Sequence, residues 1–184
     1  MKIRVLTRHI DYDGTQLRSH WAYRTLGLQG DSGVAFIGKC DVPLEHMVDL
    51  ADVRRRAPIF SRLMLHFLIE HFGIDLEKAI LRQRLFAQIA CEEIAARCER
   101  PIQRRGDDLY DGRAKLSVSI ATASSVSTPI HFGINIDAQG APVRARGLSD
   151  YGIDPLPLAR AILKHYAGEL DDIAQASTKV RPVD

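Results

Sequence analysis

Hydrophobic and polar residues alternate along several short stretches of the chain, and a period of two predicts β-strands. Near the N-terminus this pattern covers residues 2–7 and residues 34–42, the second of which is closed by a proline. A second group of alternating stretches comprises residues 102–110, 115–122, 130–137 and 141–148. Turn residues such as glycine and aspartate separate these stretches, so we expect hairpins and mainly antiparallel pairing.

Two longer stretches have a helical period instead. Residues 75–98 begin at Asp75, a good N-cap residue. The apolar stripe that follows comprises Leu76, Ala79, Ile80, Leu85, Ile89 and Ile94. Asp154 with Pro155 is expected to open a final helix that continues through Ile173.

Three shorter segments give weaker signals. Leu17, Trp21 and Leu26 have helical spacing, which predicts a short helix that a following glycine ends. Residues 44–53 fit a short helix or an irregular connection. Residues 61–72 fit a buried helix or a core strand that is covered on both faces, because periodicity does not separate these two. We favour the strand, since a glycine ends the segment and the next one has its own helix start.

These elements predict an α+β fold, with a mixed and mainly antiparallel sheet packed against helices. The chain has 184 residues, which is long enough for one hydrophobic core without a disulfide or metal staple. We expect a single domain over residues 1–176 and a loose C-terminal tail over residues 177–184.

Charge and cysteine content narrow the function classes. The formal net charge of +2 gives no reason to propose nucleic acid as a partner. The three cysteines, Cys40, Cys91 and Cys98, have no C-x-x-C spacing, so a zinc site is not indicated and a reducing cytoplasm is the expected location. No apolar run approaches the ~18 residues of a membrane span, and the N-terminus has no signal-peptide pattern.

Polar residues share one face on each of two neighbouring strands. Alternation puts Lys115, Ser117 and Ser119 on one face of residues 115–122, and His131, Gly133 and Asn135 on one face of residues 130–137. If the apolar faces of the two strands coincide on the helix layer, the polar rows also coincide. The central glycine then leaves room for a ligand. We expect either a small-molecule pocket at this patch or a solvated sheet face.

Other polar residues carry weaker hypotheses. Asp11 and Asp13 fit helix capping or a polar pocket wall. His66 and Glu70 would share a strand face, but a metal site needs a third ligand, so we favour structural roles for both. One of the helix arginines, Arg82 or Arg84, is a candidate ion-pair partner of Asp107 or Asp108.

Three stretches resemble known families. RGDDLYDGRAKLSVSI, residues 105–120, resembles the central motif of biotin protein ligases, W-P-N-D-L, a turn, then G-R/K-K-L-A-G. IHFGINI, residues 130–136, resembles the next strand of that family and the H-G-x-x-x-N strand of octanoyl transferases. VAFIGKCDVPLEHMVDLADV, residues 34–53, resembles the V-I-G-R-x-Q-N-P stretch of lipoate ligases. The whole chain also resembles a small family of uncharacterised conserved proteins from archaea and bacteria.

The ligase resemblance implies a class II synthetase-like fold and the binding, with activation, of a small carboxylic acid by acyl-adenylate formation or acyl transfer. It implies ATP with Mg²⁺ as cofactors, and Lys115 as the catalytic cation that contacts the carboxylate and the α-phosphate. The implied substrate-binding residues are Asp108, Ser117, Ser119, His131, Gly133 and Asn135. The implied cofactor-binding residues are Arg54, Arg55, Arg56, Gly112 and Arg113. Further expected partners are an acyl-acceptor protein and a second copy of the chain, as a homodimer.

One segment departs from the ligase pattern. Where the ligases carry a glycine-rich loop around the acyl adenylate, residues 54–59 read RRRAPI and contain no glycine. Two functions therefore stay open: an adenylating ligase or acyltransferase, and a binding protein that holds a nucleotide or carboxylate metabolite without adenylation. An RNA-associated protein, by analogy with the synthetases, is a third and rests only on the small positive charge.

Overall fold

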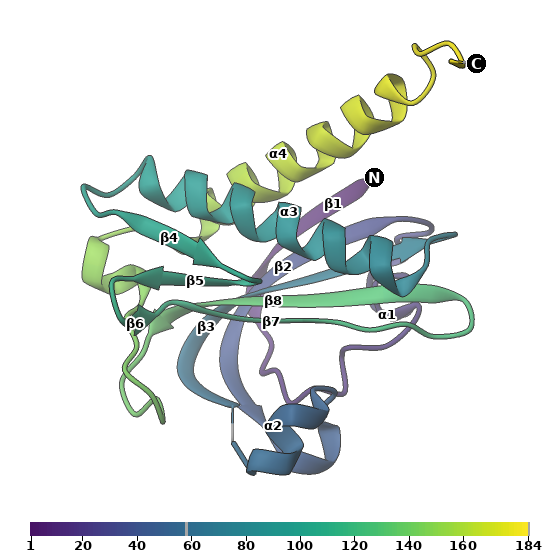
Figure 1. The fold of residues 1–184 in the computed structure, drawn as a ribbon. Coiled ribbons are helices and arrows are strands. Elements are labelled where there is room, and N and C mark those ends of the chain that lie inside the picture. Colours follow the sequence, from purple (N-terminus) through teal and green to yellow (C-terminus); the bar gives the residue numbers. More distant parts are fainter. Residues whose placement is uncertain (58, 184) are drawn as a thin grey trace.

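The computed structural model describes residues 1–57 and 59–183, and its strands form two sheets. The larger sheet has the order β1-β2-β3-β8-β7, in which only β1 and β2 pair parallel (Figure 1). Its strands are β1 (Lys2–His9), β2 (Ser32–Val42), β3 (Ile59–Phe72), β7 (Ser117–Ala121) and β8 (Ser127–Asp137). A three-stranded sheet comprises β4 (Ile102–Arg105), β5 (Asp108–Asp111) and β6 (Ala114–Lys115). The expected α+β class with mainly antiparallel pairing is confirmed.

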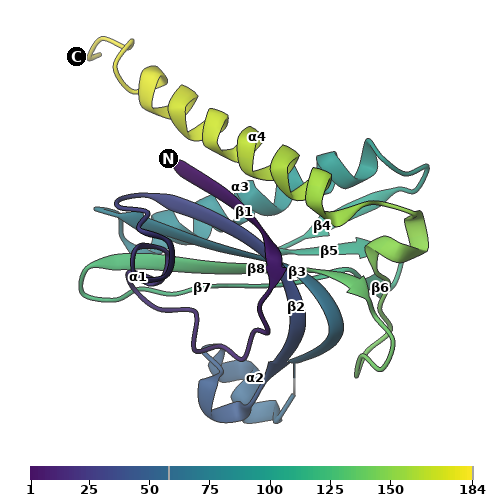
Figure 2. The ribbon, with the colours of Figure 1, turned by 180° about the vertical axis from the view of Figure 1, so that it is seen from behind.

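Two long helices, α3 (Leu76–Ala95) and α4 (Pro155–Ala176), lie on one face of the larger sheet (Figures 1 and 2). The core between these helices and the sheet contains packed aromatic rings, including Phe67 of β3, Phe86 of α3 and Tyr166 of α4. The short helices α1 (Trp21–Leu26) and α2 (Leu50–Arg55) belong to the other side, where a second apolar cluster forms. Two 3₁₀ turns complete the elements, η1 (Leu44–His46) and η2 (Leu148–Tyr151).

Local sequence explains where the long helices begin. The Asp75 carboxylate accepts a hydrogen bond from the Lys78 backbone N–H at 2.7 Å and caps α3, as expected. Asp154 caps α4 in the same way, and Pro155 supplies a fixed φ at the first helical position. Strand β3 is covered on both faces, and this explains why its sequence reads as an almost continuous apolar run.

Three sequence predictions need correction. Residues 102–110 form two strands rather than one, because Gly106 adopts φ +67° and turns the chain between β4 and β5. Residues 141–148 contain no strand; a single parallel bridge joins Ala145 to Lys115, and Pro142 has no N–H for a ladder. The first helix begins only at Trp21, so Leu17 precedes it.

Two segments discussed above each include one residue outside the described ranges. Pro58 belongs to the glycine-free segment at residues 54–59, and Asp184 belongs to the predicted C-terminal tail. Within the described ranges the three cysteines are free thiols, with Cys40 and Cys91 buried. No described helix has both the length and the apolar character needed to cross a membrane.

Candidate functional site

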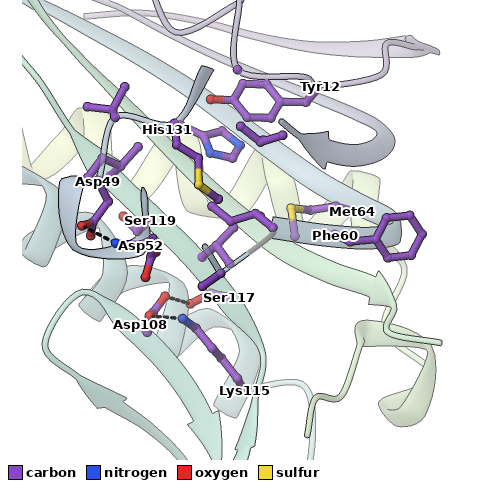
Figure 3. A pocket seen from close by; sticks show the side chains of 18 of the residues that line it. Tyr12, Asp49, Asp52, Phe60, Met64, Asp108, Lys115, Ser117, Ser119 and His131 are labelled. Carbon is purple, nitrogen blue, oxygen red and sulfur yellow. Dashed lines mark hydrogen bonds and ion pairs between the residues drawn. The ribbon is translucent and has the colours of Figure 1, made fainter. Parts of the chain in front are cut away.

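A cavity of about 350 Å³ lies against the face of the sheet that α3 and α4 leave uncovered (Figure 3). Its walls come from two distant parts of the chain. The first part runs from Tyr12 to Met64 and includes the segment around α2, and the second runs from Asp107 to Ala145. The apolar side chains of the wall include Leu17, Val42, Met47, Ile59, Phe60, Met64, Val118 and Ile120.

Lys115 lies at one end of this cavity and forms an ion pair with Asp108, with Nζ 2.6 Å from Oδ2 (Figure 3). Both side chains are partly shielded from solvent. Burial lowers the pKa of Lys115, but the charge and the hydrogen bond of Asp108 outweigh this and raise it overall. Burial raises the pKa of Asp108, and Lys115 opposes that shift. The lysine is therefore held as a cation at the cavity wall.

Ser117 and Ser119 line the cavity, but β7 does not pair with β8 in the predicted register. Ser117 lies opposite Ile134, and Val118 lies opposite Gly133. Directly opposed residues share a face, so the serines are on the same side as the helix-covered core, and Val118 and Ile120 face the cavity. The prediction that the polar rows of the two strands coincide is wrong.

Hydrogen-bond partners explain why the two serines can lie on the helix-covered side of β7. Ser117 Oγ accepts a hydrogen bond from the Leu109 N–H at 2.8 Å and donates to Asp108 Oδ1 at 3.1 Å. The amide nitrogen of Gln83 donates to Ser119 Oγ at 2.7 Å and to Asp107 at 3.0 Å. Gln83 is therefore the residue of α3 that reaches the site.

The two flanking arginines were the wrong candidates for this role. Arg82 lies 3.6 Å from Asp31, and Arg84 is exposed.

At the other end of the cavity His131 stacks on Tyr12, with ring centroids 3.9 Å apart (Figure 3). His131 Nε2 lies 3.0 Å from Nδ1 of His66, whose Nε2 lies 3.3 Å from the Gly38 carbonyl oxygen. Burial lowers the pKa of His66 to about 4 and places that of His131 well below its ordinary value, to which the neighbouring His66 also contributes. Both imidazoles are therefore neutral at neutral pH.

Gly133 and Asn135, two further residues expected to contact a ligand, differ in their position relative to the cavity. The space beside Gly133 is filled, because an added Cβ there would overlap the sulfur of Met64, and Gly133 does not line the cavity. Asn135 does line it, and its side-chain amide donates to the Arg146 carbonyl oxygen at 3.2 Å and to that of Lys115 at 3.5 Å. Gly133 therefore leaves space for the side chain of Met64, and Asn135 holds the backbone of the strand that carries Lys115.

The segment around α2 covers the cavity from the other side. Asp49 caps this helix by accepting from the Ala51 N–H at 2.7 Å, and Asp52 pairs with Arg55 at 2.8 Å. Arg54 and Arg56 are exposed and are not part of the cavity wall. Of the three arginines, only Arg55 lies at the cavity.

Gly112 and Arg113 occupy the turn between β5 and β6 and also lie outside the cavity wall. The structure thus gathers Lys115, Asp108, Ser117, Ser119, His131, Asn135 and Arg55, and it leaves out Gly133, Arg54, Arg56, Gly112 and Arg113.

Tyr12 and Gln83 were missed by sequence reasoning. Tyr12 stands between the two aspartates that were singled out, but Asp11 accepts from the Lys39 N–H and Asp13 from Thr15 instead. A tyrosine within the turn sequence D-Y-D-G could have indicated that the side chain at this position is buried against the sheet. The position of Gln83 had no signal, because one polar residue on a helix is usually solvated.

The other histidine and glutamate expectations fit the structure. Glu70 accepts from Ser127 Oγ at 2.6 Å and from the His20 N–H at 2.7 Å, and His66 has the partners given above. Both residues thus have structural partners. In residues 1–57 and 59–183, His, Cys, Asp and Glu form no group of three or more that could hold a metal ion.

Comparison with known proteins gives a family match over nearly the whole chain. The model of a family described as "Domain of unknown function (DUF366)" matches residues 1–181. An uncharacterized protein from Methanocaldococcus jannaschii is 40% identical, over 100% of this chain and 86% of its own. A solved structure described as a protein of unknown function from Pyrococcus horikoshi is 41% identical, with a TM-score of 0.94 over 100% of this chain and 99% of that one.

More distant solved structures resemble the fold alone. Biotin protein ligase from Aquifex aeolicus, in complex with biotin and ATP, is 15% identical with a TM-score of 0.63, over 90% of this chain and 71% of that one. A T. acidophilum protein solved with bound lipoic acid is 12% identical with a TM-score of 0.60, over 92% and 85% of the two chains. The expected class II synthetase-like fold of biotin and lipoate ligases is confirmed.

Proposed function

This chain belongs to the family described as Domain of unknown function (DUF366), and from that premise we propose that it binds a small carboxylic acid in the cavity, with the carboxylate at Lys115. The observation that carries the proposal is the lysine at one end of a partly apolar cavity. The fold likeness supports it, since neighbours of this fold were solved with biotin or lipoic acid bound.

Lys115 is equipped to hold a carboxylate. Its ammonium group has three donors, and Asp108 occupies one of them. Asp108 therefore fixes the direction of the side chain and leaves donors for an oxygen of the ligand. A charge-assisted hydrogen bond of this kind is about twice as strong as a neutral one.

The rest of the wall suits an apolar chain attached to the carboxylate. Met47, Phe60 and Val118 are among the side chains that line it. The volume of about 350 Å³ is at the low end of the range of small-molecule pockets, about 300–1,000 Å³. An acid with a chain of moderate length fits this space better than an acid joined to a nucleotide.

We infer that the described residues favour an acid alone over ATP at the same place. In the segment that corresponds to the glycine-rich loop of the ligases, Arg54 and Arg55 form the last residues of α2, and Arg54 and Arg56 do not line the cavity. The carboxylates of the cavity wall are those of Asp49, Asp52, Asp107 and Asp108, and its cations are Lys115 and Arg55. A triphosphate there would be repelled by these carboxylates. We therefore favour binding without adenylation.

ATP-dependent activation of the acid, with Mg²⁺, is the second candidate. The likeness to the Aquifex aeolicus ligase solved with biotin and ATP supports it. The two candidates are separated by ATP–pyrophosphate exchange measured with each acid that binds. Exchange that disappears in Lys115→Met would favour activation, and its absence with a bound acid favours binding alone.

Isothermal titration calorimetry of small acids and of their methyl esters tests the main proposal. Native mass spectrometry of freshly purified protein first shows whether a small molecule co-purifies. We expect the wild type to bind an acid but not its ester, and Lys115→Met to lose the acid by about 10- to 100-fold, which is the range for one hydrogen bond to a charged group. Arg113→Met is the matched control, because it removes an exposed cation outside the cavity.

Two results would contradict the proposal: an acid and its ester that bind equally well, or full affinity in Lys115→Met. Circular dichroism of both variants shows whether the fold is retained.

A cytoplasmic location, an acyl-acceptor protein and a homodimer complete the proposal. The free cysteines support the location, since reducing compartments keep thiols free. Light scattering after gel filtration tests the homodimer.

A further inference from the structure

We propose that the end of the cavity away from Lys115 recognises an N–H donor of the ligand, so that the site prefers acids with an amide-type head group over plain fatty acids. This inference rests on the proposed function, because it takes the carboxylate to lie at Lys115. The groups that carry it are Nδ1 of His131 and the hydroxyl of Tyr12, which belong to two residues that line the cavity (Figure 3).

The hydrogen-bond chain behind His131 fixes its tautomer. The Gly38 carbonyl oxygen can only accept, so His66 Nε2, 3.3 Å away, carries the proton. His66 is a neutral imidazole, so its Nδ1 is an acceptor. His131 Nε2, 3.0 Å from that atom, must therefore donate. Since His131 is neutral as well, its Nδ1 carries a lone pair and no proton.

This lone pair is available to a ligand. Within residues 1–57 and 59–183, neither His131 Nδ1 nor the Tyr12 hydroxyl has a hydrogen-bond partner. The buried side-chain nitrogen and oxygen atoms without partners in this part of the chain are Ser32 Oγ and Arg82 Nη1. The two free groups of the histidine and tyrosine are thus not sealed in the core. Both residues line the cavity, and we infer that both groups reach it.

The chemistry of the two groups defines the head group. Nδ1 of a neutral imidazole only accepts, whereas a tyrosine hydroxyl donates or accepts. An amide supplies both parts, an N–H for His131 and a carbonyl oxygen for Tyr12. A hydrocarbon end would cover both polar groups and satisfy neither, which is unfavourable in a partly apolar cavity.

The spacing along β8 agrees with a ligand of this kind. Asn135 contacts the backbone of Lys115, and His131 lies four residues away, which is about 13 Å at the rise of a strand. An extended chain of about eight atoms covers most of such a span, with its carboxylate directed at Lys115 and its other end at His131.

Calorimetric titration of three acids of similar length tests the inference. Pimelic acid monoamide carries the amide, monomethyl pimelate keeps the carbonyl but has no N–H, and octanoic acid has neither. We expect the monoamide to bind about tenfold more tightly than the other two, which is the upper range for one neutral hydrogen bond.

Variants identify the groups responsible. In His131→Phe an aromatic ring still covers Tyr12, and we expect the preference for the monoamide to fall to about one. This change leaves His66 without its partner, so Tyr12→Phe is the second variant. That variant removes no hydrogen bond made within the described residues. We expect it to reduce the preference for the monoamide over octanoic acid by about threefold and to leave the preference over the monomethyl ester unchanged, since both of these ligands carry the carbonyl oxygen. Tyr23→Phe, at an exposed tyrosine of α1, is the matched control.

The outcomes separate the two proposals. Equal affinity for the three acids, with loss of all of them in Lys115→Met, would overturn this inference and leave the proposed function standing. Binding that is independent of Lys115, or no binding of any acid tested, would overturn both. Two-bond ¹H–¹⁵N spectra of ¹⁵N-histidine-labelled protein examine the tautomer without a ligand. A proton on His131 Nδ1 at neutral pH would overturn the inference directly.

Discussion

Replacement of Gly133 by alanine tests how the centre of the sheet is packed beneath the cavity. An added Cβ would overlap the Met64 sulfur and would lie 3.3 Å from both Met64 Cγ and Val118 Cγ2. Favourable carbon contacts lie at about 3.5–4.0 Å, so all three atoms would have to move. Overpacking of this kind costs about 1–3 kcal/mol, and the lower chain entropy of unfolded alanine returns about 0.4–1 kcal/mol. We expect the free energy of unfolding to fall by about 1–2 kcal/mol.

Urea unfolding followed by circular dichroism measures this loss. Gly168→Ala is the matched control, since the site is in the interior of α4 with nothing within 4 Å of the added carbon. There the same change should stabilise the protein by about 0.5–1 kcal/mol, because glycine is unfavourable in a helix. If Gly133→Ala is as stable as the wild type, Met64 does not occupy the space beside Gly133 and our account of this glycine is wrong.

The same variant has a consequence for the site. Met64 lines the cavity, so a displaced thioether would move into the ligand space and weaken the binding of an acid. The double variant Gly133→Ala/Met64→Ala should lose less stability than the sum of the losses in the two single variants. We expect Met64→Ala to cost about 2–5 kcal/mol alone and at least about 1 kcal/mol less in the alanine background.

Two further predictions concern stability. The pKa of His66 in the folded protein is about 4, below the ordinary 6.5, so the unfolded chain binds more protons between these two pH values. The free energy of unfolding should therefore be highest above about pH 6.5 and should decline as the pH falls towards 4. Urea unfolding at several pH values measures this decline. His131 acts in the same direction, and a protein equally stable at pH 4.5 and pH 7 would contradict the argument. Asp75→Ala removes the cap of α3 and should cost about 0.5–2 kcal/mol, whereas Asp75→Asn should cost little, and equal losses in the two variants would exclude capping as the cause.

Much of the fold followed from the sequence because its strongest signals are local. The cap at Asp75 and the stripe that follows it determine α3. The assignment of β3 as a strand was correct because Gly73, with φ +69°, ends it before the next helix can start. The prediction of a strand at residues 141–148 was wrong because local alternation was its only basis. Its alternation is real, but a strand also needs a partner along its length, and this segment meets β6 at one bridge only.

The register of β7 could not be derived from alternation. The chain leaves the small sheet after Lys115 and enters the large one at Ser117. Leu116 lies between two different strands, so the alternation of faces does not continue from Lys115 to Ser117. Periodicity also assumes that the helix side is apolar. Here Asp108 and Gln83 satisfy the serines on that side, and these partners lie 9 and 36 residues away in the sequence. Lys115 lies at the cavity nevertheless, because it is positioned by β6 rather than by β7.

The two-part wall of the cavity has a consequence for the behaviour of the whole protein. One side comes from residues 12–64 and the other from residues 107–145, so a bound molecule would act as a removable cross-link between distant parts of the chain. Any unfolding that separates the two sides must release this molecule first. By mass action, a ligand at 100 times its dissociation constant adds about 2.7 kcal/mol to the unfolding free energy. The resistance of the protein to heat and proteases would then follow the concentration of its ligand.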